Sequence, residues 1–169
     1  DVCSSDLRRN MILGAPIDLV GGATSLVDSL VYAAEARKGT VVSYLTADTL
    51  VRANRQLLFR GLLHQCGICY ADGMGASLAS SIILRRHVKK LTANDFYGEL
   101  FRGIAVRNLA VAFVGGEEGV AHKAASCLHQ ETGVSIALCR PGYFLHSEEE
   151  DIVAALGTIE PHIVFMGMG

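Results

Sequence analysis

Asp72 is the side chain whose surroundings best suit it to chemistry. It lies in Cys69-Tyr70-Ala71-Asp72-Gly73-Met74-Gly75-Ala76-Ser77, where an apolar strand is expected to lead through a glycine turn into a helix. In open α/β sheets, ligands bind at this junction, the carboxyl end of a strand. Gly73 and Gly75 carry no Cβ atom, so a ligand can approach the backbone closely. The alternative is that Asp72 only caps the helix, a common role for aspartate, and this stretch alone favours neither.

A second candidate is the loop Gly115-Gly116-Glu117-Glu118-Gly119, which follows one expected strand and opens an expected helix. Backbone amides at the start of a helix can hold a phosphate. The loop is not the G-x-G-x-x-G motif, and the next expected strand leads into Arg140 rather than an acid that could bind a ribose. A nucleotide-binding loop and a plain tight turn both remain open.

Other groups of polar residues have simpler explanations. Cys66 and Cys69 have C-x-x-C spacing, but they overlap the start of an expected strand and no second pair could complete a zinc site, so we predict a structural role. The six histidines form no H-E-x-x-H motif, and no metal site is specified. The basic run 85–90 could meet phosphate or an anionic membrane, or it could simply suit the dipole at a helix end. A helix cap is the simplest role for Asp95.

Composition indicates an ordinary globular chain. Of 169 residues, 50% are hydrophobic and 19% charged, which is enough apolar content for a sizeable core. The net charge of -2 gives no basic footprint, so no nucleic-acid partner is expected. Five cysteines, an odd number, favour reduced thiols and a cytoplasmic location. No apolar run reaches the roughly 18 residues of a membrane span. We predict that residues 1–10 are a non-native or disordered start and that 11–169 form one domain.

The expected elements alternate between strands and helices after a short extended pair at 11–20. Strands are expected at 40–45, 67–71, 109–114, 134–138 and 161–166. Helices are expected at 24–36, at 46–64 as one or two helices, and at 76–86, 96–106, 119–132 and 148–156. In the first helix, Ser25 and Asp28 have the spacing of a capping box. This alternation predicts an α/β fold, three-layered and Rossmann-like, with a mostly parallel sheet flanked by helices.

Six segments taken together resemble the WecB/TagA/CpsF family of bacterial glycosyltransferases. In order, they are ILGAPID, YADGMG, KLTANDF, FVGGEEGVA, PGYF and IVFMGMG, and they run from Met11 to Gly169. The resemblance implies an inverting transfer of N-acetylmannosamine, its uronic acid or a related sugar from a UDP-sugar to N-acetylglucosamine on undecaprenyl diphosphate. Such enzymes build cell-surface polysaccharides such as teichoic acid or exopolysaccharide. The resemblance also implies no metal or other cofactor, and a peripheral position at the inner face of the cell membrane.

The resemblance assigns roles residue by residue. Asp72 matches the general base, which takes a proton from the acceptor hydroxyl. Tyr44 and Thr46 fall where the family has threonine and asparagine, Lys90 where it has arginine, and Ala93 where glycine is usual. Gly115, Gly116 and Gly119 match the family's nucleotide-binding loop, and Tyr143 matches the tyrosine that contacts the uridine. The resemblance therefore implies that Asp72 and this loop share one crevice. The expected substrate-binding residues are Tyr44, Thr46, Gly73, Gly75, Lys90, Asp95, Gly115, Gly116, Gly119 and Tyr143.

Two other readings of the function stay open. One is an NAD(P)-dependent Rossmann oxidoreductase, and the other is a nucleotide-sugar-binding module without catalysis. The family's P-x-Q-E segment and its basic, membrane-contacting C-terminal appendage would follow Gly169, so we expect this chain to be a truncated and nearly inactive piece of a longer enzyme. Assembly into a homo-oligomer is left open.

Overall fold

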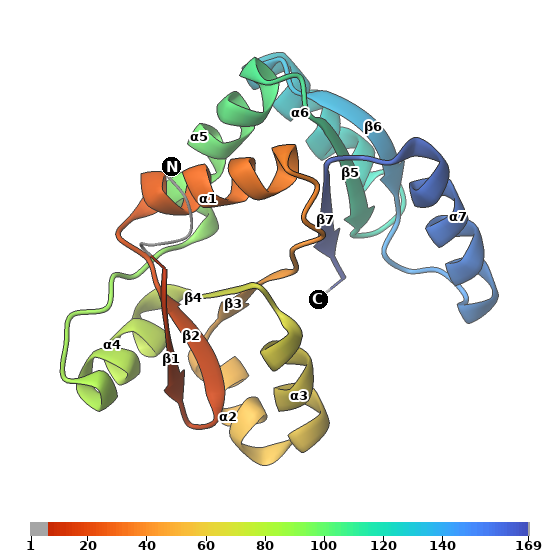
Figure 1. Ribbon diagram of the computed structural model, residues 1–169. Coiled ribbons are helices and arrows are strands. Elements are labelled where there is room, and N and C mark those ends of the chain that lie inside the picture. The colour runs from red at the N-terminus through yellow and green to blue at the C-terminus, as the bar shows by residue number, and fades with distance from the viewer. Residues whose placement is uncertain (1–6, 169) are drawn as a thin grey trace. The chain divides into compact units, whose positions relative to one another are not determined.

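A computed structural model describes residues 7–168 of the chain. The chain divides into two compact units; the N-terminal unit ends at Tyr97 and the C-terminal unit begins at Gly98. Each unit contains its own strands and helices (Figure 1). The expected single domain stays a prediction. Of the start predicted at 1–10, residues 1–6 lie outside the described residues, whereas residues 8–10 form part of a strand, so the expectation of disorder is wrong there.

The N-terminal unit begins with an antiparallel hairpin. Strand β1 (Arg8–Ile12) pairs with β2 (Ala15–Leu19) across a two-residue turn. Leu13 and Gly14 both have positive φ angles, 50° and 84°, as tight hairpin turns of this length favour. The hairpin corresponds to the extended pair expected from the sequence.

A parallel pair of strands carries Asp72. Strand β3 (Val42–Leu45) pairs in parallel with β4 (Ile68–Ala71), and helices α2 (Ala47–Arg55) and α3 (Leu57–Gln65) connect them. Thr46 caps α2, since its Oγ1 accepts a hydrogen bond from the Thr49 amide at 3.1 Å. Gln56 has an extended backbone between α2 and α3. The region expected to form one or two helices therefore forms two.

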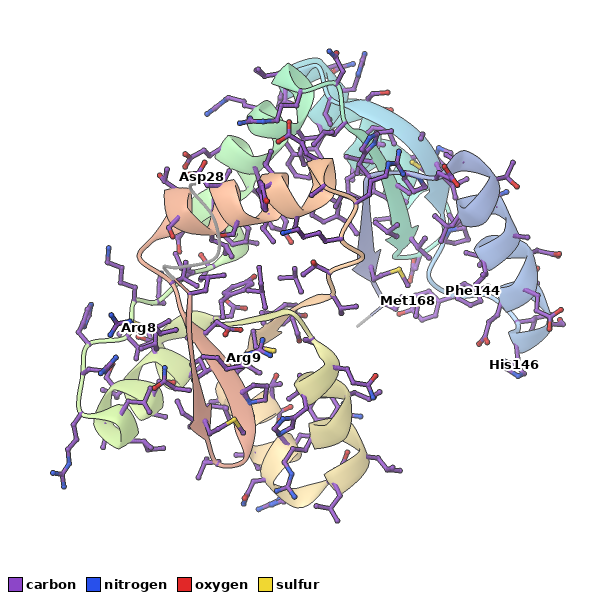
Figure 2. The ribbon with its side chains drawn as sticks, viewed as in Figure 1. Arg8, Arg9, Asp28, Phe144, His146 and Met168 are labelled. Atoms are coloured by element: carbon purple, nitrogen blue, oxygen red, sulfur yellow. The ribbon has the colours of Figure 1, made fainter. Side chains whose placement is uncertain are left out.

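An ion pair between a half-exposed arginine and a buried aspartate joins the hairpin to β4. The guanidinium of Arg9 donates to both carboxylate oxygens of Asp18, at 3.0 and 2.8 Å, and the Cys69 amide donates to Asp18 Oδ2 at 2.7 Å. Arg9, labelled in Figure 2, also donates to the carbonyls of Cys66 and Gly67. The Asp18 side chain on β2 is therefore hydrogen-bonded directly to the backbone of β4.

Two cysteines lie in the core of this unit, as predicted. Cys66 and Cys69 are buried and form no disulfide, and burial raises the pKa of Cys69 to about 12, so its thiol stays protonated. They belong to a core of buried apolar residues that also includes Ile12, Ile17, Leu45, Leu50, Leu63 and Ala76. The capping box expected at Ser25 is wrong: helix α1 (Ala23–Glu35) is preceded by Gly22, with no side-chain cap bond.

The remaining helices of this unit start earlier than the sequence predicted. Helix α4 (Gly73–Leu84) begins at once after Asp72, and α5 (Ala93–Val106) begins three residues before Phe96 and crosses into the C-terminal unit. Their first turns include glycine or polar residues, which weakened the helical pattern in the sequence.

The C-terminal unit is a small parallel α/β layer. Strand β5 (Ala110–Gly115) lies between β6 (Ser135–Arg140) and β7 (Ile163–Gly167), both parallel to it. Helix α6 (Val120–Thr132) connects β5 to β6, while a short 3-10 turn η1 (His146–Glu148) and α7 (Glu149–Ile159) lead to β7. The alternation of helices with parallel strands confirms the α/β prediction, with the β1-β2 hairpin as the antiparallel exception.

Candidate functional site

Asp72 lies at the end of β4, and the structure argues against the helix-cap alternative. Its backbone is extended (φ -102°, ψ 127°) at the N-cap position of α4, yet its side chain makes no cap hydrogen bond. The residue is half-buried. Its carboxylate is therefore not committed to the first turn of α4, as a capping aspartate would be.

Extended backbone lies on both sides of Asp72. On one side, the Asp72 amide donates to the Leu45 carbonyl at 2.9 Å, at the end of β3. On the other side, Leu91 forms a parallel bridge with Asp72, and its amide donates to the Ala71 carbonyl at 3.2 Å. The residues that follow, Thr46 and Thr92, thus leave the same edge as Asp72. This edge is where a parallel sheet places its ligand site.

Lys90 and Asp95, both predicted to bind substrate, contact each other. Their Nζ and Oδ2 atoms lie 3.7 Å apart. Asp95 Oδ2 also accepts from the backbone amide and the hydroxyl of Thr92, at 2.7 and 2.8 Å, so Asp95 caps α5 from within its first turn and not from the position before the helix that was expected. These bonds, together with the charge of Lys90, lower the pKa of Asp95. Asp95 therefore stays ionised beside Lys90, and its substrate contact remains a prediction.

An aromatic group that was not predicted from the sequence lies near Asp72. Tyr70 and Phe96 meet edge to face with ring centroids 5.7 Å apart, and the Phe96 and Tyr97 rings are 5.0 Å apart. Burial, then the neighbouring tyrosines and the charge of Asp72, raise the pKa values of Tyr70 and Tyr97. Both phenols keep their protons. A signal was present, because residues two apart on a strand share a face, as Tyr70 and Asp72 do.

Two predicted glycines begin α4. Gly73 has φ +76°, a conformation that side chains disfavour. A Cβ atom on Gly75 would lie 2.9 Å from the Cβ of Ala47 on α2. Gly75 is thus explained by close helix packing, and its contact with a substrate remains a prediction.

In the C-terminal unit, glycines bring three strand ends into backbone contact. A Cβ on Gly115 would lie 2.4 Å from the Gly167 carbonyl oxygen, so only glycine fits at the end of β5. The Gly116 amide donates to that same carbonyl at 3.0 Å, and the Gly142 amide donates to the Gly116 carbonyl at 2.8 Å. The loops after β5, β6 and β7 therefore meet at one point.

Tyr143 follows Gly142 directly and therefore lies next to the glycine loop. Its side chain is 78% exposed, which leaves the ring accessible to a ligand. Gly119 closes the loop at the N-cap of α6 with φ +82°, and Glu117 and Glu118 are exposed. The first amides of α6 have no partner within the helix and carry the positive end of its dipole. The loop and Tyr143 are together in this unit, whereas Asp72 belongs to the other, so their common crevice stays a prediction.

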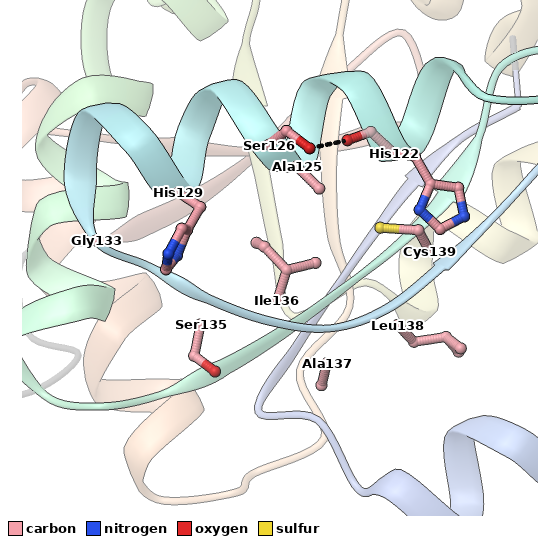
Figure 3. A pocket seen from close by; sticks show the side chains of 10 residues that line it. All are labelled: His122, Ala125, Ser126, His129, Gly133, Ser135, Ile136, Ala137, Leu138 and Cys139. Carbon is pink, nitrogen blue, oxygen red and sulfur yellow. Dashed lines mark hydrogen bonds between the residues drawn. The ribbon is translucent and has the colours of Figure 1, made fainter.

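A pocket of the C-terminal unit is lined by other residues than those of the predicted site. It has a volume of 550 Å³ and lies along α6 and β6, with lining side chains that include His122, His129 and Cys139 (Figure 3). His129 Nδ1 is 2.9 Å from the Val134 carbonyl, and burial raises the pKa of Cys139. The lining includes no residue of the predicted site.

The described part of the chain has neither a cluster of metal-binding side chains nor a helix suited to spanning a bilayer. Within residues 7–168, no three His, Cys, Asp or Glu side chains gather in a way that could hold a metal ion. Over the same residues, no helix is both long enough and apolar enough to span a bilayer.

Comparison with known proteins assigns the family. No curated protein matches the chain. The family model described as "Glycosyl transferase WecG/TagA/CpsF family" matches residues 10–169, nearly the whole chain. The match covers Asp72, the Gly115 loop and Tyr143 alike. The chain therefore belongs to the WecG/TagA/CpsF family of glycosyltransferases, enzymes of cell-surface polysaccharide synthesis that move a sugar from a nucleotide-sugar donor to a sugar acceptor.

Proposed function

We propose that this glycosyltransferase moves N-acetylmannosamine, its uronic acid or a related sugar from UDP to N-acetylglucosamine on undecaprenyl diphosphate. The proposal extends the family assignment through the motif resemblance. The observation that carries it is Asp72, a carboxylate at the end of a parallel strand that makes no cap bond to the following helix. Membership of a transferase family argues against the oxidoreductase and the non-catalytic module.

In the proposed reaction, Asp72 acts as the general base. An acceptor hydroxyl oxygen attacks the anomeric carbon of the donor sugar, the bond from that carbon to the diphosphate breaks, and UDP leaves with the electron pair. Asp72 takes the hydroxyl proton as the new bond forms. A single displacement of this kind inverts the anomeric centre and needs no covalent nucleophile. Tyr70 and Tyr97, whose pKa values are raised mainly by burial, keep their phenolic protons near Asp72.

The roles in donor binding are proposed residue by residue. Lys90 is proposed to offset charge on the leaving diphosphate, acting as a point charge because lysine lacks the bidentate fork of arginine. Tyr44 and Thr46 are assigned to the sugar. Gly116 and Gly119 are assigned to the nucleotide, with Gly115, Gly73 and Gly75 allowing close backbone approach.

Tyr143 is assigned to the uridine, which its exposed ring could stack against. The transfer is proposed to need no metal, as the resemblance implies. Attachment at the inner face of the cell membrane is proposed because the implied acceptor is lipid-linked.

Ligand-dependent thermal stability tests the proposed donor. A ligand at about 100 times its Kd stabilises a protein by about 2.7 kcal/mol, so UDP should raise the Tm measurably. NADH at the same concentration should not. Tyr143→Ala should weaken the UDP shift, while Tyr32→Ala, at an exposed tyrosine on α1, serves as the control. Stabilisation by NADH but not by UDP would contradict the proposal.

A further inference from the structure

Helix α4 turns most of its large apolar side chains toward solvent, although Leu84 packs against the core. Its buried residues are small, Ala76 and Ser80, and the helix packs on α2, β4 and β1. The outward side chains Met74, Leu78 and Ile82 are 72%, 60% and 69% exposed. They lie four residues apart, so they form one stripe along the helix, and Ile83 at 47% exposure widens it.

A basic cluster follows this stripe directly. Four of the 15 lysines and arginines of the chain lie between residues 85 and 90, all exposed. No acidic residue occurs between Gly73 and Leu91, although the whole chain is acidic by two charges. The cluster is therefore a local feature, continuous with the apolar stripe.

We propose that the α4 surface, which consists of Met74, Leu78, Ile82 and Ile83 on α4 with Arg85 and Arg86 directly after it, docks on an anionic lipid bilayer. Apolar side chains beside arginines are the combination by which a helix lies in a membrane interface, with the apolar face in the acyl boundary and the cations among the headgroups. Charge favours lipid over a second copy of the chain, because two such surfaces would bring cations without acidic partners into one interface. Twelve residues give a contact of about 18 Å, suited to lying on a bilayer and not to spanning it.

The α4 surface lies close in the chain to the proposed catalytic base. The biological role of membrane docking therefore rests on the proposed function. Met74 is two residues from Asp72, because α4 begins where β4 ends. Docking α4 would therefore hold the proposed base close to the headgroup layer. A sugar on a lipid diphosphate emerges at that level.

Vesicle flotation tests the inference. The probes are vesicles of phosphatidylglycerol with phosphatidylcholine in equal parts, and of phosphatidylcholine alone. We expect the chain to float with the anionic vesicles and to bind them less as ionic strength rises from about 0.1 to about 1 M, where the Debye length falls from roughly 10 to 3 Å. The double variant Leu78→Ser/Ile82→Ser and the variant Arg86→Glu should each weaken binding about tenfold or more.

The chain offers a matched control on α3. Leu58 and Leu62 are also four residues apart and are 89% and 61% exposed, so Leu58→Ser/Leu62→Ser removes similar apolar surface without touching α4. This variant should float as the unsubstituted chain does. Far-UV circular dichroism checks that each variant is folded.

Three results would overturn the inference. They are no binding to anionic vesicles, equal loss in the α3 and α4 variants, or an unchanged affinity in the α4 variant. In the last case, a fall in solution mass would identify the α4 surface as a contact between copies of the chain. UDP binding, measured on the same samples, separates the two proposals: a vesicle failure with UDP binding intact removes the α4 surface alone, while absent UDP binding removes the proposed function.

Discussion

The ion pair between Arg9 and Asp18 gives a stability prediction that the structure makes quantitative. The Asp18 side chain is 4% exposed and the Arg9 side chain is 40% exposed. Replacing Arg9 with methionine keeps much of its aliphatic bulk, but leaves a buried carboxylate whose remaining hydrogen bond comes from the Cys69 amide. Removing one partner of a buried pair costs about 3–5 kcal/mol. Water can reach this site through the exposed side, so we expect about 3 kcal/mol for Arg9→Met.

Substitution of the other partner, Asp18, should lower the free energy of unfolding by less. In Asp18→Asn, the amide oxygen can still accept from Cys69, and the exposed side of Arg9 can be solvated by water. We expect a loss of about 1–3 kcal/mol, the cost of a buried hydrogen bond left incomplete. The double variant should lose less than the sum of the two single variants, since both remove the same interaction. Losses of this size are a large share of a typical folding free energy of about 5–15 kcal/mol.

Urea unfolding followed by circular dichroism measures these differences, and exchange of the Cys69 amide proton reports on the β2-β4 connection directly. Arg8→Met is the matched control, because Arg8 is an exposed arginine on the same strand (Figure 2). A free energy of unfolding for Arg9→Met within about 0.5 kcal/mol of the control would refute the reasoning.

Two further predictions concern the site. Gly115→Ala should separate β5 from β7 and weaken UDP binding, since the added Cβ would lie 2.4 Å from the Gly167 carbonyl oxygen; Gly157→Ala, where the added Cβ meets nothing within 4 Å, is the control. An unchanged Tm and unchanged UDP affinity would contradict this close approach. Tyr70 has a raised folded-state pKa, so its stabilisation is complete below about pH 10, the unfolded value, and is lost as pH rises through the higher folded value. Urea unfolding at rising pH should show a shallower alkaline decline for Tyr70→Phe than for the unsubstituted chain, and equal declines would contradict the assignment.

Much of the fold follows from local patterns. The β-branched and apolar run at 109–114 predicted β5 because a buried parallel strand needs such residues, and the glycines after it marked the turn. The start of α4 was placed too late, because Gly73 and Gly75 lower helix propensity. Gly75 is nevertheless required by the approach of α2, a contact that depends on residues distant in the sequence.

The candidate site was predictable only where its signals are local. The residues around Asp72 and the glycine loop each predicted the end of a strand. The structure places Asp72 directly after β4 and the glycine loop at the end of β5. The Arg9–Asp18 bond to Cys69 depends on a contact about 50 residues away and leaves no local pattern. Asp95 was correctly expected to cap a helix, but its contact with Lys90 depends on the geometry of the turn between them.

The central claim is that Asp72 is the general base, and Asp72→Asn tests it most directly. Two quantities are measured for each variant of the complete gene product: the rate of sugar transfer and the affinity for the UDP-sugar. Asp48→Asn, in the first turn of α2, is measured alongside as a second substitution of a carboxylate by an amide. We predict that Asp72→Asn lowers turnover about 100-fold or more while donor affinity changes by no more than a few fold. Unchanged turnover in Asp72→Asn would contradict the account.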